Sequence, residues 1–361
     1  MSLYLDANAT EPLRPEAREA VLAALDAGGN PSSVHGAGRV ARRRLEAARE
    51  AVTARCGRRL GLTEVVFTAG GTEANALAIH GLGHGRRVLV GATEHPAVLA
   101  AAPAASRLPV LPDGTFDLDA LAAALSGGPP ALVCAMAANN ETGVLHPLAA
   151  IAVLCREHGA LLHVDAVQAA GRVALPPGAD SLALSGHKLG GPPGAGALLL
   201  RPGLDLPALI AGGGQERGRR GGTEPLPAIA GLAAALDAAD PAQHPEAGTR
   251  LAALRDRIEA GLDEGVVIAG AGAPRLPNTS CILLPRVAAE TQVIALDLAG
   301  VRVSAGAACS SGKVARSHVL EAMGFGTAAG SGIRISLPWN AAEDAPDRFL
   351  AAWAAMRARL A

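Results

Sequence analysis

The chain has 361 residues, of which half are hydrophobic and 2% are aromatic, and it carries a net charge of −1 at pH 7. This length predicts two domains, and the near-neutral charge argues against nucleic acid or an anionic membrane surface as the main partner. The first residues, MSLYLDANAT, lack a basic segment followed by an apolar one, so we expect no signal peptide. The longest uncharged run, 120–140, is interrupted by SGGPP, which argues against a membrane span.

Helix and strand patterns alternate along the first two thirds of the chain. Helices are predicted at 15–28, 37–55, 73–83, 95–102, 118–128 and 147–159. Strands are predicted at 64–68, 87–92, 131–137, 160–165, 181–185 and 196–201. Strands separated by helices predict an α/β fold, in which a mainly parallel sheet is covered by helices on both faces.

The pattern changes near residue 249. A helix at 251–262, strands at 266–270, 278–284 and 332–337, and a final helix are typical of an α+β arrangement. We therefore expect a large α/β domain at 15–248 and a smaller α+β domain formed by 1–14 and 249–361. The segment 211–225 is rich in Gly and Arg, and its composition alone predicts an exposed basic loop.

Two polar motifs follow predicted strands, at the sheet edge where open α/β folds bind ligands. FTAGGTEAN places Gly70, Gly71 and Thr72 between a strand and a helix, which favours phosphate binding because a helix N-terminus presents free N–H groups. A threonine cap with turn glycines explains this motif equally well. HVDAVQ places Asp165 at a strand end, with Gln168 one turn later. Its carboxylate can pair with a protonated ring nitrogen, although an ordinary helix cap is the alternative.

The stretch SGHKLGGPPGAG, residues 185–196, contains one of only two lysines, Lys188 and Lys313, among 32 basic residues. In a chain so biased toward arginine, a lysine indicates chemistry that arginine cannot perform, namely loss of a proton and formation of a Schiff base with a carbonyl. A phosphate-binding helix end, an acid after one strand and a lysine after a later strand are together what pyridoxal phosphate requires.

The chain has five cysteines and no CxxC pair, which argues against a disulfide framework and a structural zinc site and indicates a reducing cytoplasm. Cys309 lies in a run of small residues, SAGAACSSGK, which is typical of an exposed loop and suits a nucleophile. The other cysteines are interpreted as core residues: Cys56, Cys134, Cys155 and Cys281. Arg334 lies in the apolar pattern GIRISL, and its guanidinium suits the α-carboxylate of an amino acid. With so many arginines, the pattern alone does not select it.

These motifs resemble those of the cysteine desulfurases, the NifS/IscS-like group of fold-type I pyridoxal-phosphate enzymes. The matching stretches run in order from Tyr4 to Leu337: YLDANAT, GNPSSVHGAGR, FTAGGTEANALAI, TEHPAV, ANNETGV, HVDAVQ, SGHKLGGPPGAGAL, GGGQERGRRGGTE, GAACSSGK and GIRISL. The resemblance implies a fold-type I transferase, with a mainly parallel central sheet covered by helices and a smaller α+β domain that carries the cysteine loop.

The resemblance also implies a role for each matching residue. Lys188 would hold pyridoxal 5'-phosphate as a Schiff base, and Asp165 would pair with the pyridine nitrogen. His95, in TEHPAV, would stack on the ring and move protons. The ring hydroxyl would be contacted by Asn140 and Gln168.

The phosphate and the substrate would have their own groups. The resemblance assigns the phosphate to Gly71, Thr72, Ser185 and His187, and to Thr223 of a second subunit. Arg334 would bind the substrate carboxylate, with Asn8 and Asn140 nearby. Cys309 would accept the sulfur.

The implied reaction converts L-cysteine to L-alanine and leaves the sulfur as a persulfide on Cys309. The implied partners are a second copy of the chain, in a homodimer, and an iron–sulfur scaffold or another sulfur-acceptor protein. No resident metal is expected, although Cys309 would transiently touch an iron–sulfur cluster. The alternatives are a selenocysteine lyase, another fold-type I aminotransferase, and a non-catalytic sulfur-transfer partner. An aminotransferase would have no use for Cys309, and Lys188, Asp165 and His95 argue against a non-catalytic protein.

Overall fold

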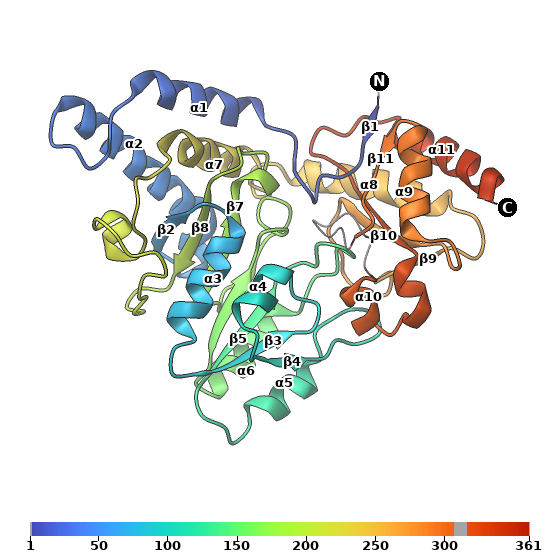
Figure 1. The fold of residues 1–361 in the computed structure, drawn as a ribbon, viewed down its shortest axis with the longest axis horizontal. Helices are drawn as coiled ribbons and strands as arrows, with labels where there is room; N and C mark the ends of the chain where they lie inside the picture. The colour runs from blue at the N-terminus through green and yellow to red at the C-terminus, as the bar shows by residue number, and fades with distance from the viewer. Residues whose placement is uncertain (1, 307–315, 361) are drawn as a thin grey trace.

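The computed structural model describes residues 2–306 and 316–360. Its central feature is a seven-stranded sheet with the strand order β2-β8-β7-β6-β5-β3-β4 (Figure 1). The strands are β2 Glu64–Thr68, β3 Arg87–Gly91, β4 Ser106–Leu108, β5 Ala131–Met136, β6 Leu161–Asp165, β7 Ser181–Ser185 and β8 Gly196–Leu200. Strand β8 is antiparallel to both of its neighbours, and the other adjacent pairs are parallel. The predicted α/β fold with a mainly parallel sheet is confirmed.

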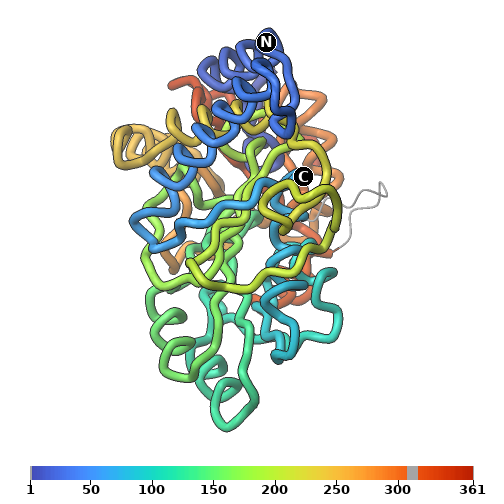
Figure 2. Tube along the Cα trace, turned by 90° about the vertical axis from the view of Figure 1, so that its left-hand side faces the viewer, coloured from blue at the N-terminus to red at the C-terminus, as the bar shows by residue number. Residues whose placement is uncertain are grey.

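Both faces of this sheet are buried under helices, because alternate residues of each strand point to opposite sides. In β5, Val133 and Ala135 belong to one apolar cluster, whereas Leu132 and Cys134 belong to another. The first cluster includes residues of α1 Pro15–Ala27, α2 Gly36–Val52, α5 Leu118–Leu125, α6 Leu148–Glu157 and α7 Leu226–Ala238. The second includes residues of α3 Gly71–Leu82 and α4 Pro96–Ala101. Helices α1 and α2 pack on α7, as the ribbon of Figure 1 and the Cα trace of Figure 2 show.

The C-terminal part of the chain forms a second apolar core around a three-stranded antiparallel sheet. Its elements are α8 Pro245–Ala260, β9 Val267–Ile268, β10 Thr279–Leu283, α9 Ala289–Leu298, α10 His318–Ala322, β12 Gly332–Ser336 and α11 Ala345–Leu360. The N-terminus joins this part, because β1 Leu3–Tyr4 pairs in parallel with β11 Val301–Arg302. Leu5, Phe349 and Trp353 lie in the same core. Strands β1, β4 and β11 were not predicted, since two or three residues show no periodicity.

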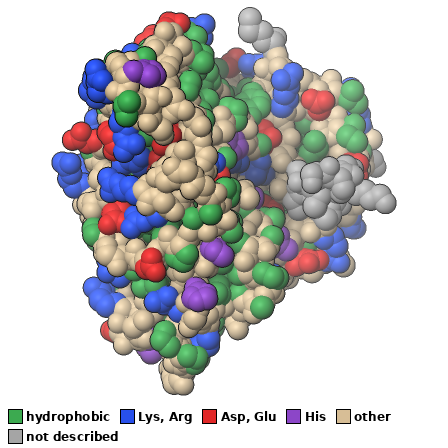
Figure 3. All heavy atoms as spheres, turned by 60° about the vertical axis from the view of Figure 1, so that its left-hand side comes forward, with side chains coloured by type: hydrophobic (Ala, Val, Ile, Leu, Met, Phe, Trp, Pro, Cys, Tyr) green, Lys and Arg blue, Asp and Glu red, His purple; other side chains and the backbone are tan. Residues whose placement is uncertain are grey.

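The carboxyl ends of the parallel strands meet beside this C-terminal part. Met136 pairs with Asp165 across β5 and β6, and Asp165 pairs with Ala183 across β6 and β7, so the polar motifs that follow these strands converge. The surface is hollowed between the larger and the smaller part of the molecule (Figure 3). The fold thus brings the sequence motifs to the edge at which open α/β sheets bind ligands.

The Gly- and Arg-rich segment 211–225 is mostly exposed, as its composition predicted, and it is also anchored to the sheet. Glu216 is buried, and its carboxylate accepts hydrogen bonds at 2.8 Å from both terminal nitrogens of Arg49 and from the backbone N–H of Phe67. Glu216 and Arg217 have positive φ angles of 48° and 59°, which non-glycine residues rarely adopt. The buried ion pair holds the segment in this conformation, a contact between residues far apart in the sequence.

Candidate active site

A cavity of about 390 Å³ lies between the carboxyl edge of the large sheet, the N-terminal segment and β12. This volume falls in the range of about 300–1,000 Å³ that is usual for small-molecule sites. Among the predicted site residues, its lining includes Asn8, Gly71, Thr72, His95, Asn140, Asp165, Gln168, Ser185, His187, Lys188 and Arg334. Thr223 is exposed and does not line it, and Cys309 lies outside the described residues.

Lys188 ends a short 3₁₀ turn, Gly186–Lys188, that directly follows β7. Its ammonium donates hydrogen bonds to the backbone carbonyls of Asn8 and, at 2.9 Å, Ala9. Burial lowers the pKa of Lys188 to about 8, and the positive charges of Arg334 and Arg172 act in the same direction. About a tenth of this amine is therefore neutral at pH 7, and able to react with a carbonyl, which is far more than for an ordinary lysine.

This environment predicts the pH dependence of Lys188 reactivity. In the cofactor-free protein, the rate at which acetic anhydride acylates Lys188 should rise with pH and reach half its maximum near pH 8, because only the neutral amine reacts. An ordinary lysine has a pKa of about 10.4. Pulse labelling followed by peptide mass mapping measures the profile, with a lysine in an unstructured peptide as the control. A midpoint above pH 10 would contradict the environment described here.

Asp165 ends β6 and is buried at the floor of the cavity. Its Oδ1 accepts the N–H of Val167 at 2.9 Å, and its Oδ2 accepts the side-chain N–H of Asn75 at 2.7 Å. Burial raises the pKa of Asp165, whereas these two bonds and the positive charge of Lys188 oppose the rise. No helix directly follows Asp165 in the part of the chain that the structure describes, so the alternative of an ordinary helix cap is wrong, and the bond to Val167 closes a local turn instead.

The phosphate motif forms the first turn of α3. The helix begins at Gly71, two residues earlier than predicted, and its N-cap is Gly70, so the threonine-cap interpretation of Thr72 is wrong. A Cβ atom on Gly71 would lie 2.6 Å from Cγ2 of Val167, so only glycine fits there. Ser185 also lines this end of the cavity. The free N–H groups of the helix thus face a space in which an anion would be stabilised.

Two histidines lie at this cavity in different settings. Nδ1 of His187 lies 3.2 Å from the Thr10 hydroxyl, with which it shares a hydrogen bond. Burial lowers the pKa of His187 to about 4. His95 caps α4, because its Nδ1 accepts the N–H of Ala97 at 3.1 Å. Burial also lowers the pKa of His95, against the opposite effect of Asp165. His95 is therefore both the helix-start residue that the pattern suggested and a neutral ring at the cavity.

Arg334 of β12 is the one arginine among the described residues that line the cavity. Its two terminal nitrogens donate to Asp6 Oδ1 at 2.6 Å and to the carbonyl of Asn140 at 3.0 Å. Its buried Nε has no partner within the described parts of the chain. Asn8 donates to the same Asn140 carbonyl at 3.2 Å and to the Thr279 hydroxyl at 2.9 Å. A carboxylate in the cavity would satisfy the free donor of Arg334.

Comparison with known proteins agrees with this geometry. A model of the aminotransferase class-V family matches residues 3–349. A cysteine desulfurase of Cereibacter sphaeroides is 45% identical, with 96% of this chain and 94% of the relative aligned. The chain belongs to the aminotransferase class-V family, among its cysteine desulfurases.

Other relatives support the same assignment. An IscS-like cysteine desulfurase of Mycobacterium tuberculosis is 40% identical over 94% of this chain and 92% of the relative. Among solved structures, a NifS-like protein from Rickettsia africae superposes with a TM-score of 0.90 at 32% identity, covering 99% of this chain and 100% of the other. The expected fold-type I architecture and the expected enzyme class are confirmed.

Two residues that the sequence motifs did not single out also shape the candidate active site of this cysteine desulfurase. Asp6 pairs with Arg334 and lines the cavity, and Asn75 bonds to Asp165. Asp6 precedes Asn8 in the matched YLDANAT stretch, and Asn75 ends the run TEAN that follows the phosphate glycines. Both residues therefore lie inside motifs that match the family, but the sequence does not show that Asp6 binds Arg334 or that Asn75 binds Asp165.

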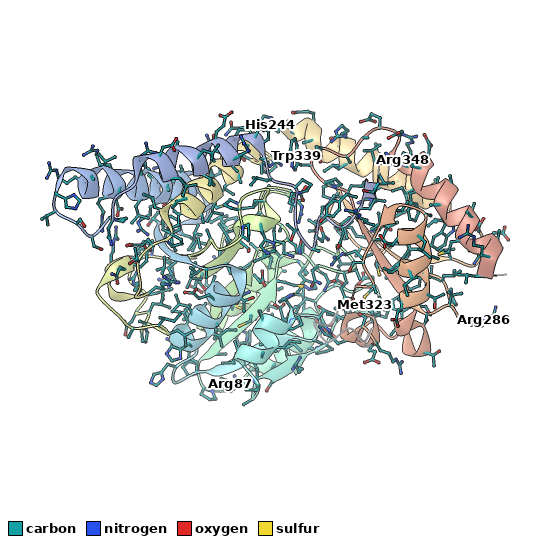
Figure 4. The ribbon with its side chains drawn as sticks, turned by 45° about the horizontal axis from the view of Figure 1, so that its top comes forward. Arg87, His244, Arg286, Met323, Trp339 and Arg348 are labelled. Carbon is teal, nitrogen blue, oxygen red and sulfur yellow. The ribbon has the colours of Figure 1, made fainter. Side chains whose placement is uncertain are left out.

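A larger cleft of about 720 Å³ lies on the other side of Lys188. His244 and Trp339, which are labelled in Figure 4, both line it. Arg172 is paired there with Glu11 at 2.8 Å. This cleft contains neither Asp165 nor the start of α3, so the smaller cavity remains the candidate active site.

Within residues 2–306 and 316–360, no cluster of three or more His, Cys, Asp or Glu side chains has an arrangement suited to a metal ion. None of the helices in the same ranges combines the length and the apolar character that crossing a membrane requires.

Proposed function

We propose that this cysteine desulfurase uses pyridoxal 5'-phosphate to convert L-cysteine to L-alanine and passes the sulfur to Cys309 as a persulfide. One observation carries the proposal. Lys188, Asp165 and the first turn of α3 line a single cavity, with Arg334 on the side of the C-terminal part. An amine with a lowered pKa, a buried carboxylate and an anion-binding helix end are the groups that this cofactor needs.

The described residues fit the cofactor at each of its polar groups. Lys188 would hold the aldehyde, Asp165 the pyridine nitrogen, and Asn140 and Gln168 the ring hydroxyl. The phosphate would contact Gly71, Thr72, Ser185 and His187, which all line the cavity, and a side chain on Gly71 would collide with Val167. When bound, the cofactor supplies an electron sink for charge that develops on the substrate.

Arg334 orients the substrate. Its unpartnered Nε and its terminal nitrogens suit the α-carboxylate of L-cysteine, and Asn8 and Asn140 lie beside it. Binding of a carboxylate here competes with Asp6 for the guanidinium. The side chain of Arg334 is buried, and charge-assisted hydrogen bonds are stronger in buried surroundings than in water.

Proton transfer falls to Lys188 and His95. The Lys188 amine, with a pKa of about 8, is able to take up and release a proton near neutral pH. His95 is held by the bond from Ala97 to its Nδ1, so its Nε2 is the nitrogen left for the cavity. The neutral ring then carries its hydrogen on Nε2, so His95 acts from this atom as a donor of a hydrogen bond or a proton. We assign the proton at substrate Cα to Lys188.

The sulfur step is a transfer between two thiols. The Cys309 thiolate attacks the substrate sulfur, an S–S bond forms, and the Cβ–S bond breaks with its electron pair left on the carbon side. A proton then completes L-alanine, so one L-cysteine and one enzyme thiol become one L-alanine and one enzyme persulfide. An ordinary thiol has a pKa of about 8.5 and is mostly protonated at neutral pH, so it requires deprotonation first.

We further propose a homodimer, in which Thr223 of the second subunit completes the phosphate site. The exposure of Thr223 and its absence from the cavity of its own chain support this arrangement.

We also propose two domains, with 15–248 binding the cofactor and 1–14 with 249–361 forming the smaller unit. The separate apolar core that joins Leu5 to Phe349 supports this division.

The sulfur acceptor is proposed to be an iron–sulfur scaffold in the cytoplasm. The stretch GAACSSGK resembles the longer form of the cysteine loop, which is associated with delivery to scaffold proteins. Cys56, Cys134, Cys155 and Cys281 are free thiols, which supports a reducing compartment.

The experiment that tests the function is a reaction of the purified holoenzyme with L-cysteine. We expect alanine by chromatography and a mass increase of one sulfur on the peptide that contains Cys309. In the variant Cys309→Ala, persulfide at this position is lost and sulfur release falls by about 10²-fold or more, because the nucleophile is removed. Cys281→Ala, a buried thiol outside the cavity, is the control that should retain the reaction. Sulfur release by Cys309→Ala at the wild-type rate would disprove the mechanism.

A further inference from the structure

A line of buried side-chain hydrogen bonds leads from Asp165 into the protein, away from the cavity. Asn75 donates to Asp165 Oδ2 at 2.7 Å, and Asn75 Oδ1 lies 2.9 Å from Nε2 of His163. The other nitrogen of this ring, Nδ1, lies 2.8 Å from the Ser181 hydroxyl. Asn75 is 1% exposed, and His163 and Ser181 are fully buried. The proposed mechanism does not use any of these three residues.

The backbone places these side chains by its regular geometry. His163 and Asp165 are two residues apart on β6 and therefore point to the same face of the sheet. His163 and Ser181 are paired residues on the adjacent strands β6 and β7. Asn75 lies one turn beyond Gly71 on α3, so the helix whose N-terminus faces the phosphate end also contacts Asp165.

The donors and acceptors along this line have only one consistent assignment. An ionised Asp165 only accepts hydrogen bonds, so Asn75 must present its NH₂ group to it and its oxygen to His163. Nε2 of His163 must then carry the hydrogen, which leaves Nδ1 as an acceptor for the Ser181 hydroxyl. Burial lowers the pKa of His163 to about 3, so the ring is neutral and keeps this single tautomer.

We propose that His163 and Ser181 are positioning residues that act through Asn75 to keep the carboxylate of Asp165 ionised and aimed into the cavity. A buried carboxylate is costly unless hydrogen bonds satisfy it. If His163 no longer donates to Asn75, the amide of Asn75 is free to rotate and to present its oxygen to Asp165, which would repel the charge. The titratable groups that act on Asp165 from other elements are Glu94, His95 and Lys188.

This inference rests on the proposed function, since it concerns the group that Asp165 would face in the holoenzyme. An ionised Asp165 would stabilise the protonated pyridine nitrogen of the cofactor. The hydrogen bonds of Asn75, His163 and Ser181 should therefore change the proton affinity of this ring nitrogen. A purely structural role of these residues would change stability alone.

The test is nitrogen NMR of the holoenzyme loaded with pyridoxal phosphate labelled with ¹⁵N in the ring, recorded as a function of pH. We expect His163→Phe to lower the pKa of the cofactor's pyridine nitrogen by about one unit, a tenfold loss of proton affinity. The reason is that Asn75 then binds the ionised Asp165, which stabilises the protonated nitrogen, less strongly. His163→Gln offers an N–H to Asn75 and should restore part of the shift. The matched control is His146→Phe, the same replacement at a buried histidine that does not line the cavity.

Ser181→Ala and Ser181→Thr keep the test decisive if His163→Phe does not fold. Loss of the hydroxyl frees the tautomer of His163, so the alanine variant should shift the ring nitrogen in the same direction and the threonine variant should not. An unchanged titration in folded His163→Phe or Ser181→Ala would overturn the inference while leaving the proposed function intact. Failure of the native protein to bind pyridoxal phosphate at all would instead disprove the proposed function.

Discussion

Replacing Lys188 by arginine should abolish alanine formation from L-cysteine, with a rate loss of at least about 10²–10⁴-fold from proton transfer alone. The guanidinium keeps the positive charge but stays protonated, so it neither reacts with an aldehyde nor takes a proton from the substrate. Burial already holds the pKa of Lys188 at about 8, which an arginine could not reproduce. Chromatographic measurement of alanine gives the rate.

A second variant separates the chemistry of Lys188 from its charge. Lys188→Ala leaves space for a small primary amine, and added methylamine should restore part of the activity to this variant but not to Lys188→Arg. In the native holoenzyme, borohydride reduction should attach the cofactor to the peptide that contains Lys188, as peptide mass mapping would show. Native activity in Lys188→Arg, or a native Lys188 peptide left unmodified, would refute the assignment.

Glu216→Gln should lower the free energy of unfolding by about 3–5 kcal/mol, the cost of leaving a buried charge without its partner. Both terminal nitrogens of Arg49 and the N–H of Phe67 donate to this carboxylate at 2.8 Å. Without it, the buried Arg49 would keep only the partly exposed Glu46, at 3.2 Å from its Nε, as a charged partner. Because whole domains are stable by only about 5–15 kcal/mol, the loss should be large in urea unfolding.

The double variant Arg49→Met with Glu216→Leu distinguishes an unpaired charge from lost packing. It removes both charges and should recover much of the stability lost in Glu216→Gln, since apolar replacements of buried pairs are often nearly neutral. The matched control is Arg42→Ala, which removes an exposed ion pair with Glu46 and should cost no more than about 0.5 kcal/mol. A cost that small for Glu216→Gln would mean that the buried pair does not anchor the segment.

Local patterns in the sequence determined most of the elements around the site. The runs ALLHVD and SLALS predicted β6 and β7, and Pro15 and Gly28 bracketed α1, as the structure confirms. The bias toward arginine singled out Lys188, because a rare residue type is informative in a biased chain. These features depend on a few neighbouring residues, and short stretches of sequence therefore suffice to predict them.

Contacts between distant segments were decided only by the tertiary structure. Arg334 differs from the other arginines because β12 brings it to Asp6 and Asn140, which lie far away in the chain. Strand β8 runs antiparallel to its neighbours, although its apolar run GALLL is equally compatible with either direction. Asn75, which binds Asp165, and Arg49, which binds Glu216, are likewise far from their partners in the sequence. Residue types and spacings encode propensity and periodicity, whereas the pairing of buried polar groups depends on how the whole chain packs.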